Sequence, residues 1–225
     1  MGNLIAIVGN SGSGKSTSIR TLNPEETFII NVASKPLPFK GWRTKYTAWT
    51  KDNPNGNFVN TSNVDQISKI LYYIETKRPE IKNVILDDAQ YLMAFEAMDR
   101  AKEKGFEKFT EIAQKFYSIL KSSISMRDDL NVIVSCHAEN VGDGLNPIYK
   151  IKTIGKMIDN VITVEGLFTY VLFTHIESND DGNIYSFITQ SDGTTTAKTP
   201  LDCFETKLIP NDLQFVIDKI NEFNS

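Results

Sequence analysis

Residues 9–16 read Gly-Asn-Ser-Gly-Ser-Gly-Lys-Ser and satisfy the pattern G-x-x-x-x-G-K-S/T in full. The glycines let successive backbone N–H groups turn toward one anion, and the start of a helix adds its partial positive charge. Lys15 can then reach the terminal phosphates of ATP, and the Ser16 hydroxyl can coordinate Mg²⁺. We therefore predict a nucleotide-binding loop made of Gly9, Asn10, Ser11, Gly12, Ser13, Gly14, Lys15, Ser16 and Thr17.

Two carboxylates, Asp87 and Asp88, follow the apolar run 84–86. Such a run is typical of a strand buried on both faces of a parallel sheet. Because Mg²⁺ needs a second oxygen anchor, we expect Asp87 to bind it, usually through water, together with Ser16. Asp88 is expected to orient or deprotonate the attacking water. Aspartate is also a favoured helix N-cap, and that alternative stays open for Asp88.

His137 directly follows another apolar run, 131–136. P-loop ATPases of this layout usually carry a polar residue here that senses the terminal phosphate, and histidine changes its charge with small shifts of environment. The alternative is a partly buried histidine that hydrogen-bonds to the backbone. Glu139 lies nearby and is a second candidate base. The catalytic candidates are thus Lys15, Asp88, His137 and Glu139.

Hydrophobic periodicity predicts the elements that position these residues. Prolines and glycines make 34–60 mostly irregular surface chain, and Gly142, Gly144 and Pro147 make 138–153 a loop. The turn-forming residues 178–182 predict an antiparallel hairpin at one edge of the sheet. Strands are expected at 4–8, 27–32, 83–88, 131–136, 163–176 and 183–189, and helices at 15–22, 64–76, 106–126 and 210–223.

We therefore predict an α/β fold of the P-loop NTPase type, in which helices flank a mostly parallel central sheet. The 225 residues fit a single domain, 1–225, and 40% hydrophobic with 23% charged residues is ordinary globular composition. Cys136 and Cys203 lie far apart and in no metal-binding spacing, so we expect two reduced thiols. No secretion signal is present, and the longest apolar stretch, 161–173, is too short to span a bilayer. A soluble, cytoplasmic protein without membrane contact is expected.

The segment from Lys35 to Lys51 is rich in basic and aromatic residues and contains no acidic residue. Aromatic rings beside cations suit single-stranded nucleic acid, each stacked base contributing about 1–3 kcal/mol. The net charge of −4 means that any nucleic acid must be held by such a local patch. The alternative is that the rings pack under the loop or against a neighbouring subunit. The nucleic-acid candidates here are Lys40, Trp42, Arg43 and Lys45.

The chain resembles the RecA-like ATP-binding proteins of bacteriophages, which include phage AAA-type and single-strand annealing ATPases. The resemblance rests on the 9–16 loop near residue 1, Asp87-Asp88, the strand end 135–137, and the segments 187–193 and 196–198. It implies an oligomeric ATPase, a ring or a filament, that acts on single-stranded DNA in recombination, repair or annealing. A single-strand binding protein is a candidate partner, and a phage-encoded protein would act in the host cytoplasm.

The resemblance also implies roles for four lysines and exposes one departure. The loop 138–153, with Lys150 and Lys152, would contact DNA. Lys156 and Lys198 could reach a neighbour's nucleotide as trans fingers, or be ordinary surface lysines. RecA proteins carry a catalytic glutamate after the second strand, whereas 31–35 contains no acid here. Either Asp88 or Glu139 takes that role, or hydrolysis is slow.

Two other readings of the phosphate loop remain open. A P-loop kinase of a small molecule usually carries an arginine-rich lid, but the arginines of this chain are scattered. A non-hydrolytic assembly protein would use ATP only as a conformational ligand. We favour the ATP-hydrolysing DNA recombination protein.

Overall fold

The computed structural model describes residues 2–143, 145–154 and 162–225, and these residues form an eight-stranded sheet with the order β10-β9-β8-β1-β5-β4-β2-β3. The pairs from β8 through β1, β5, β4 and β2 to β3 are all parallel, while β9 and β10 are antiparallel to their neighbours. The strands are β1 Asn3–Val8, β2 Thr27–Asn31, β3 Phe58–Asn60, β4 Asn83–Asp87, β5 Asn131–Cys136, β8 Tyr170–Asn179, β9 Gly182–Ile188 and β10 Leu208–Pro210.

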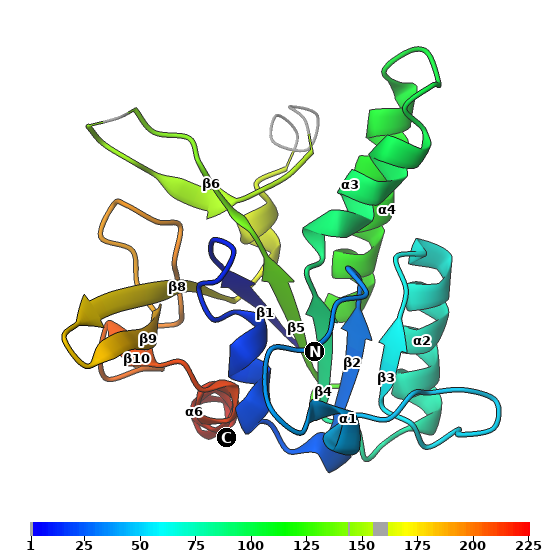
Figure 1. Ribbon diagram of the computed structural model, residues 1–225, viewed down its shortest axis with the longest axis horizontal. Coiled ribbons are helices and arrows are strands. Elements are labelled where there is room, and N and C mark those ends of the chain that lie inside the picture. Colours follow the sequence, from blue (N-terminus) through cyan, green and yellow to red (C-terminus); the bar gives the residue numbers. More distant parts are fainter. Residues whose placement is uncertain (1, 144, 155–161) are drawn as a thin grey trace.

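The central strands are apolar in their middle residues, which fits a sheet that is covered on both faces. Alternate side chains of β1 show this: Leu4 and Ala6 join the core under one layer of helices, and Ile5 and Ile7 join the core under the other. The first layer contains α2 Val64–Lys77, α3 Gln90–Asp99 and α4 Glu107–Ile124. The second contains the 3-10 helix η1 Ser16–Thr21 and α6 Leu213–Asn224. Figure 1 shows α2, α3 and α4 gathered together and α6 apart from them.

Helices α2 and α6 form where apolar residues recur at helical spacing and a polar side chain caps the start. In α2 the buried residues Ile67, Ile70 and Ile74 lie on one face, and the side chain of Asn63 accepts a hydrogen bond from the Gln66 N–H. Asp212 caps α6 in the same way. Helix α2 confirms the predicted segment 64–76, and α4 confirms 106–126 to within two residues at each end. Helix α6 confirms the helix predicted at 210–223 but begins three residues later, because Pro210 ends β10.

The predicted fold class is confirmed, with differences in detail. The helix predicted at 15–22 is the 3-10 helix η1, and the strand predicted from 163 begins only at Tyr170, because Val164–Leu167 forms the 3-10 helix η3. The predicted loop 138–153 contains a hairpin of β6 Ala138–Asn140 and β7 Tyr149–Ile151. Helix α3 and strand β10 were not expected from the sequence. The segment 34–60 is mostly irregular, as predicted, apart from α1 Trp42–Lys45 and β3.

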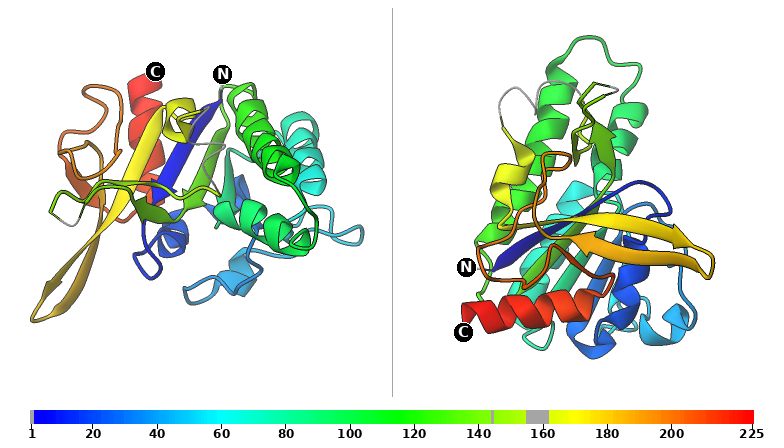
Figure 2. Two further views of the ribbon diagram at one scale, coloured as in Figure 1. Left: turned by 90° about the horizontal axis from the view of Figure 1, so that it is seen from above. Right: turned by 90° about the vertical axis from the view of Figure 1, so that its left-hand side faces the viewer.

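The antiparallel hairpin of β8 and β9 was predicted at a sheet edge and is confirmed there, extended by β10. Figure 2 shows this hairpin projecting beyond the rest of the sheet. The short 3-10 helix η2 Pro24–Glu26 precedes β2. Within the residues that the structure describes, no helix has the length and apolar character needed to cross a bilayer.

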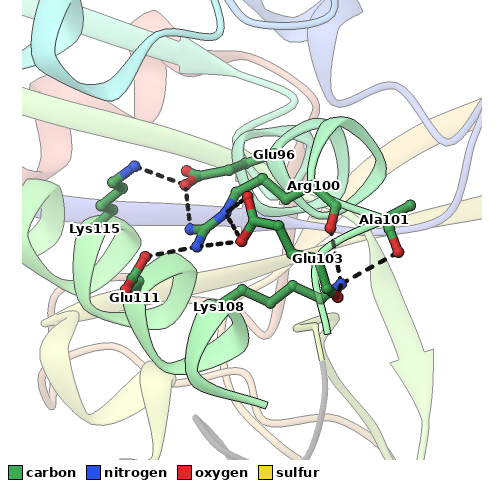
Figure 3. A network of polar contacts seen from close by, with 7 residues as sticks. All are labelled: Glu96, Arg100, Ala101, Glu103, Lys108, Glu111 and Lys115. Carbon is green, nitrogen blue, oxygen red and sulfur yellow. Dashed lines mark hydrogen bonds and ion pairs between the residues drawn. The ribbon is translucent and has the colours of Figure 1, made fainter. Parts of the chain in front are cut away.

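Helices α3 and α4 are joined by a group of charged side chains that we call the Arg100 network (Figure 3). The Arg100 guanidinium forms ion pairs with Glu96, Glu103 and Glu111, at 2.8 to 3.2 Å. Lys108 Nζ donates to the carbonyl oxygens of Arg100 and Glu103, at 2.8 Å each. The network therefore fastens the end of α3 and the following turn to α4.

Candidate nucleotide-binding site

The loop 9–16 follows β1 and curls back on itself instead of extending. Gly14 adopts a φ of +96°, in the left-handed region that favours glycine. Gly9 is required for a different reason, since a Cβ atom there would lie 1.8 Å from Thr174 Oγ1 on β8. The loop is thus held closely against β8, and its shape depends on glycine at both positions.

Lys15 lies over this loop, and only 6% of it is exposed. Its Nζ donates hydrogen bonds to the carbonyl oxygens of Gly9, at 2.9 Å, and Asn10, at 2.8 Å. Burial lowers the pKa of Lys15, and the charges of Asp88 and Asp87 partly oppose that shift. An ammonium has three N–H donors, so these two carbonyls leave one donor for an anion in the adjoining cavity.

Ser16 and Asp87 meet although they lie 71 residues apart in the sequence. The Ser16 hydroxyl donates to Asp87 Oδ1 at 2.9 Å, and the Ser135 hydroxyl donates to the same oxygen at 2.6 Å. Burial is the largest cause that raises the pKa of Asp87, and the negative charge of Asp88 raises it further. The two hydroxyl donors oppose this shift. The adjacency follows from the sheet, because β4 and β1 both pair with β5 and their carboxyl ends lie at one edge.

The chemistry of this pair fits Mg²⁺. A hydroxyl and a carboxylate are hard oxygen ligands, and Mg²⁺ is commonly held by one or two such groups with the remaining positions filled by water and substrate phosphates. In the described part of the chain there is no group of three or more His, Cys, Asp or Glu side chains suited to a metal.

Asp88 points its carboxylate toward the same cavity. Its φ is +57°, and its backbone N–H donates to Ser135 Oγ at 2.7 Å. Oδ2 lies 2.5 Å from Lys35 Nζ, and Oδ1 lies 3.6 Å from His137 Nε2. Helix α3 begins after Ala89 with no side-chain cap, so the N-cap alternative for Asp88 has no hydrogen bond in its favour.

His137 is partly buried and lies edge-on to Tyr91, with ring centroids 5.8 Å apart. Burial lowers its pKa, the charge of Lys15 adds to the shift and the charge of Asp88 opposes it, so the net effect favours the neutral imidazole. The cavity that His137 borders has a volume of about 260 Å³. Its walls are Ser11, Gly12, Ser13, Gly14, Lys15, Ser16, Thr17, Lys35, Pro36, Pro38, Asp87, Asp88 and His137.

Several residues predicted from the sequence lie outside this cavity. Gly9 and Asn10 form the base of the loop and border a second hollow toward β8. Glu139 on β6 lies 3.4 Å from Lys150 Nζ on β7, across the hairpin, and does not line the cavity. Lys198 forms a backbone bridge with Val171 on β8. Lys152 follows β7 and donates its backbone N–H to the His137 carbonyl. Lys156 lies outside the described residues.

The aromatic rings of the basic segment 35–51 contact the rest of the chain. Trp42 lies 5.4 Å from Phe58, between ring centroids, and the Arg43 guanidinium covers its ring at 4.9 Å. Trp49 packs against Phe28 and Tyr73. Tyr46 is buried, and its burial raises the pKa of the phenol to about 12. This is the packing that the alternative interpretation of the segment expects.

The cavity also contains residues that sequence reasoning assigned elsewhere or missed. Lys35 was grouped with the nucleic-acid segment, yet its ammonium lies in the nucleotide cavity. The sequence shows that Lys35 comes just after β2, but it does not show which strand lies beside β2. Because β2 pairs with β4, and the Val32 N–H donates to the Asp87 carbonyl, the end of β2 must lie beside Asp87 and Asp88. Ser135 was noted only as part of a strand end.

Comparisons with known proteins agree with the fold. No curated protein matches the sequence significantly. Among solved structures, a KaiC-like protein from the hyperthermophilic archaeon Pyrococcus horikoshii OT3 is similar, with a TM-score of 0.50 and 12% sequence identity over 83% of this chain and 77% of that one. At this identity the likeness concerns the fold alone. A family described as an AAA domain matches residues 1–201, and the chain therefore belongs to this family of α/β P-loop proteins.

Proposed function

We propose that this protein is an Mg²⁺-dependent ATPase whose turnover is coupled to assembly on single-stranded DNA. The observation that carries the first half is the convergence of Lys15, Ser16, Asp87, Asp88 and His137 on one cavity. These side chains come from three separate parts of the sequence. They supply the cation, the metal anchors and the candidate base that phosphoryl transfer to water requires.

In this proposal the loop amides and Lys15 hold the phosphates of ATP. Ser16 and Asp87 would hold Mg²⁺, which neutralises charge that develops on the phosphate oxygens during transfer. Asp88 lies one residue beyond Asp87 and is poised to orient a water molecule and accept its proton. His137, neutral and bordering the same cavity, is able to donate a hydrogen bond to the terminal phosphate.

The DNA half of the proposal is supported by a small group of exposed cations. Lys40, Arg43 and Lys45 lie on or beside α1, and none of them forms an ion pair with another residue in the described ranges. Unpaired cations on a protein of net charge −4 are available to phosphates. Trp42 is half-buried beneath Arg43, so its ring is a smaller stacking platform than the sequence alone indicates.

Self-assembly into a ring or filament is part of the same proposal. Exposed apolar side chains on the two hairpins support it, because such residues are commonly covered by a neighbouring subunit. They are Val141, Leu145 and Ile148 around β6 and β7, and Ile184 and Tyr185 on β9. A role in DNA recombination, repair or annealing, and Lys198 as a trans finger, remain proposals that such an assembly would permit.

The deciding experiment is ATP turnover measured with and without single-stranded DNA. Stimulation by DNA supports both halves of the proposal. Turnover that is unaffected by DNA supports an ATPase and removes the DNA coupling. Binding without turnover identifies a non-hydrolytic assembly protein, and turnover only with a small acceptor identifies a kinase. A protein that binds no nucleotide at all contradicts the proposal entirely.

The DNA contact is tested separately through salt. If Lys40 and Lys45 touch DNA phosphates, Lys40→Ala and Lys45→Ala each reduce the slope of log affinity against log salt by about 0.7. Lys69→Ala, an exposed lysine on α2, is the matched control and leaves the slope unchanged. If all of these variants have the same slope as the wild type, the DNA surface lies elsewhere.

A further inference from the structure

We propose that Lys35 is a nucleotide-sensing cation supplied by the same chain. When a nucleoside triphosphate enters the cavity, the Lys35 ammonium breaks its ion pair with Asp88 and binds the terminal phosphate instead. The inference rests on the proposed nucleotide binding and adds a residue and a switch to it. It predicts that this protein distinguishes triphosphate from diphosphate through Lys35. It also predicts that the carboxylate of Asp88 becomes available to the attacking water only when the triphosphate is in position.

The first observation is the asymmetry of the ion pair between Lys35 and Asp88. The two charged atoms, Nζ and Oδ2, lie 2.5 Å apart, but the lysine side chain is 59% exposed and the aspartate side chain only 2%. An exposed lysine has many rotamers available and can move its ammonium by several ångströms at little cost. The buried carboxylate cannot follow. Any exchange of partners in the cavity is therefore made by Lys35.

The second observation is the turn that delivers Lys35. The buried Asn31 side chain donates through Nδ2 to the Lys35 carbonyl, at 2.6 Å, and to Asn60 Oδ1, at 2.8 Å. The Val32 N–H donates to the Asp87 carbonyl at 3.1 Å. These bonds fix the backbone of Lys35 beside the end of β4, while its side chain stays free to turn.

Backbone strain occurs on both sides of this ion pair. Ser34 has a φ of +55° and Asp88 a φ of +57°, in a region that non-glycine residues rarely adopt. Such strain persists only where the surrounding structure enforces it, and it is concentrated at functional sites. Here the two strained residues lie on the two loops that bring Lys35 and Asp88 together.

The third observation is the balance of charge in the cavity. Among its lining residues Asp87 and Asp88 are negative and Lys15 and Lys35 are positive, so the formal charges cancel. Lys15 already donates to two loop carbonyls. A triphosphate adds several negative charges, and Lys35 can exchange its ion pair with Asp88 for one with a phosphate oxygen. A diphosphate lacks the terminal group and would leave the ion pair intact.

The test compares the affinities of Lys35→Ala for a non-hydrolysable ATP analogue and for ADP, both with Mg²⁺, by calorimetry. Loss of one charge-assisted hydrogen bond should weaken the analogue about 10-fold or more, with ADP changed less than about 3-fold. Lys35→Arg should restore the preference for the triphosphate, because the guanidinium keeps the charge. Lys51→Ala, an exposed lysine on the same segment, is the matched control and should bind both nucleotides as the wild type does.

The outcomes separate the inference from the proposed function. If the wild type binds neither nucleotide, the proposed function itself fails. If the wild type binds both and Lys35→Ala weakens both equally, with a lower melting temperature, Lys35 only stabilises the turn and the inference is wrong. If Lys35→Ala binds both nucleotides normally, Lys35 senses no phosphate and the inference is again wrong.

Discussion

The nucleotide cavity and the Arg100 network both bring carboxylates and cations within hydrogen-bonding distance, but they differ in burial. Asp87 and Asp88 are 3% and 2% exposed, whereas Glu103 and Glu111 are 51% and 55% exposed at their side chains. Each acid of the network has an arginine or lysine partner, and even the least exposed of them, Glu96, is 20% exposed at its side chain. The buried acids border a cavity instead. Ion pairing alone therefore does not mark a functional site, whereas buried charge beside a cavity does.

The two groups also arise differently from the sequence. Arg100 meets Glu96 and Glu103 at spacings of four and three residues, so one helix and its end create most of the network. The cavity is assembled from the carboxyl ends of β1, β2, β4 and β5, which only the sheet brings together. Exposed pairs contribute little stability, while buried charges cost stability and are retained where they have a role. The comparison thus predicts large effects on function for substitutions in the nucleotide cavity and small ones for substitutions in the Arg100 network.

The largest effect is expected for Lys15→Ala. The change removes the buried ammonium that donates to the loop carbonyls, so of the two cations that line the cavity only Lys35 remains to offset the repulsion between a phosphate and Asp87 and Asp88. Nucleotide affinity should fall by about 100-fold, which is within the range expected for the loss of one charge-assisted hydrogen bond. Equilibrium binding of a fluorescent nucleotide measures this. Near-normal affinity in the variant would mean that the loop is not the phosphate site, and Lys69→Ala is the control.

A smaller and more selective effect is expected for Asp88→Asn. The amide keeps the shape of the side chain but cannot accept the proton of a water molecule, so turnover should fall by about 10²–10⁴-fold. Nucleotide affinity should not fall by more than about threefold, because the change removes a negative charge from the cavity and no phosphate-binding donor. Single-turnover kinetics separates the two quantities. Asp181→Asn, in the exposed turn between β8 and β9, is the matched control, and unchanged turnover in Asp88→Asn would remove the base assignment.

Much of the fold and the core of the site could be predicted because their signals are local. An apolar run before glycines, an acid pair after an apolar run, and helical spacing each occur within a few residues of sequence. The exceptions are elements with weak local patterns. In α3 only Gln90, Leu92 and Met93 are buried, so no apolar stripe indicates a helix. Strands β6 and β7 have three residues each, too few for an alternating pattern.

The position of Lys35 could not be predicted because it depends on strand order. Its neighbours in the sequence are prolines, aromatics and other cations, which favour a surface segment. Only the pairing of β2 with β4 puts the end of β2 beside Asp88. Glu139 gives the opposite lesson. It is close to His137 in sequence, but the turn into β6 directs it toward Lys150.

The smallest effect is expected for Arg100→Ala, which removes the centre of the exposed network. Turnover and nucleotide affinity should be unchanged, because none of its partners lines the nucleotide cavity. The melting temperature should fall by about 4 °C or less at neutral pH, since Glu96, Glu103 and Glu111 lose their shared cation. Thermal unfolding followed by circular dichroism measures this difference, and Lys121→Ala on α4 is a control outside the network.

The pH dependence of that difference provides the finer test. The hydrogen bond from Arg100 lowers the pKa of Glu103 from its ordinary value of 4.5, so the stabilisation is present above pH 4.5 and is lost as pH falls through the folded-state pKa. The gap in melting temperature between wild type and variant should therefore shrink in acid, and also in high salt. A gap that persists in both conditions would mean that Arg100 acts through packing of its aliphatic stem. A loss of turnover in Arg100→Ala would break the comparison itself, because the exposed network would then be coupled to the cavity through α3, whose first turn follows Asp88 directly.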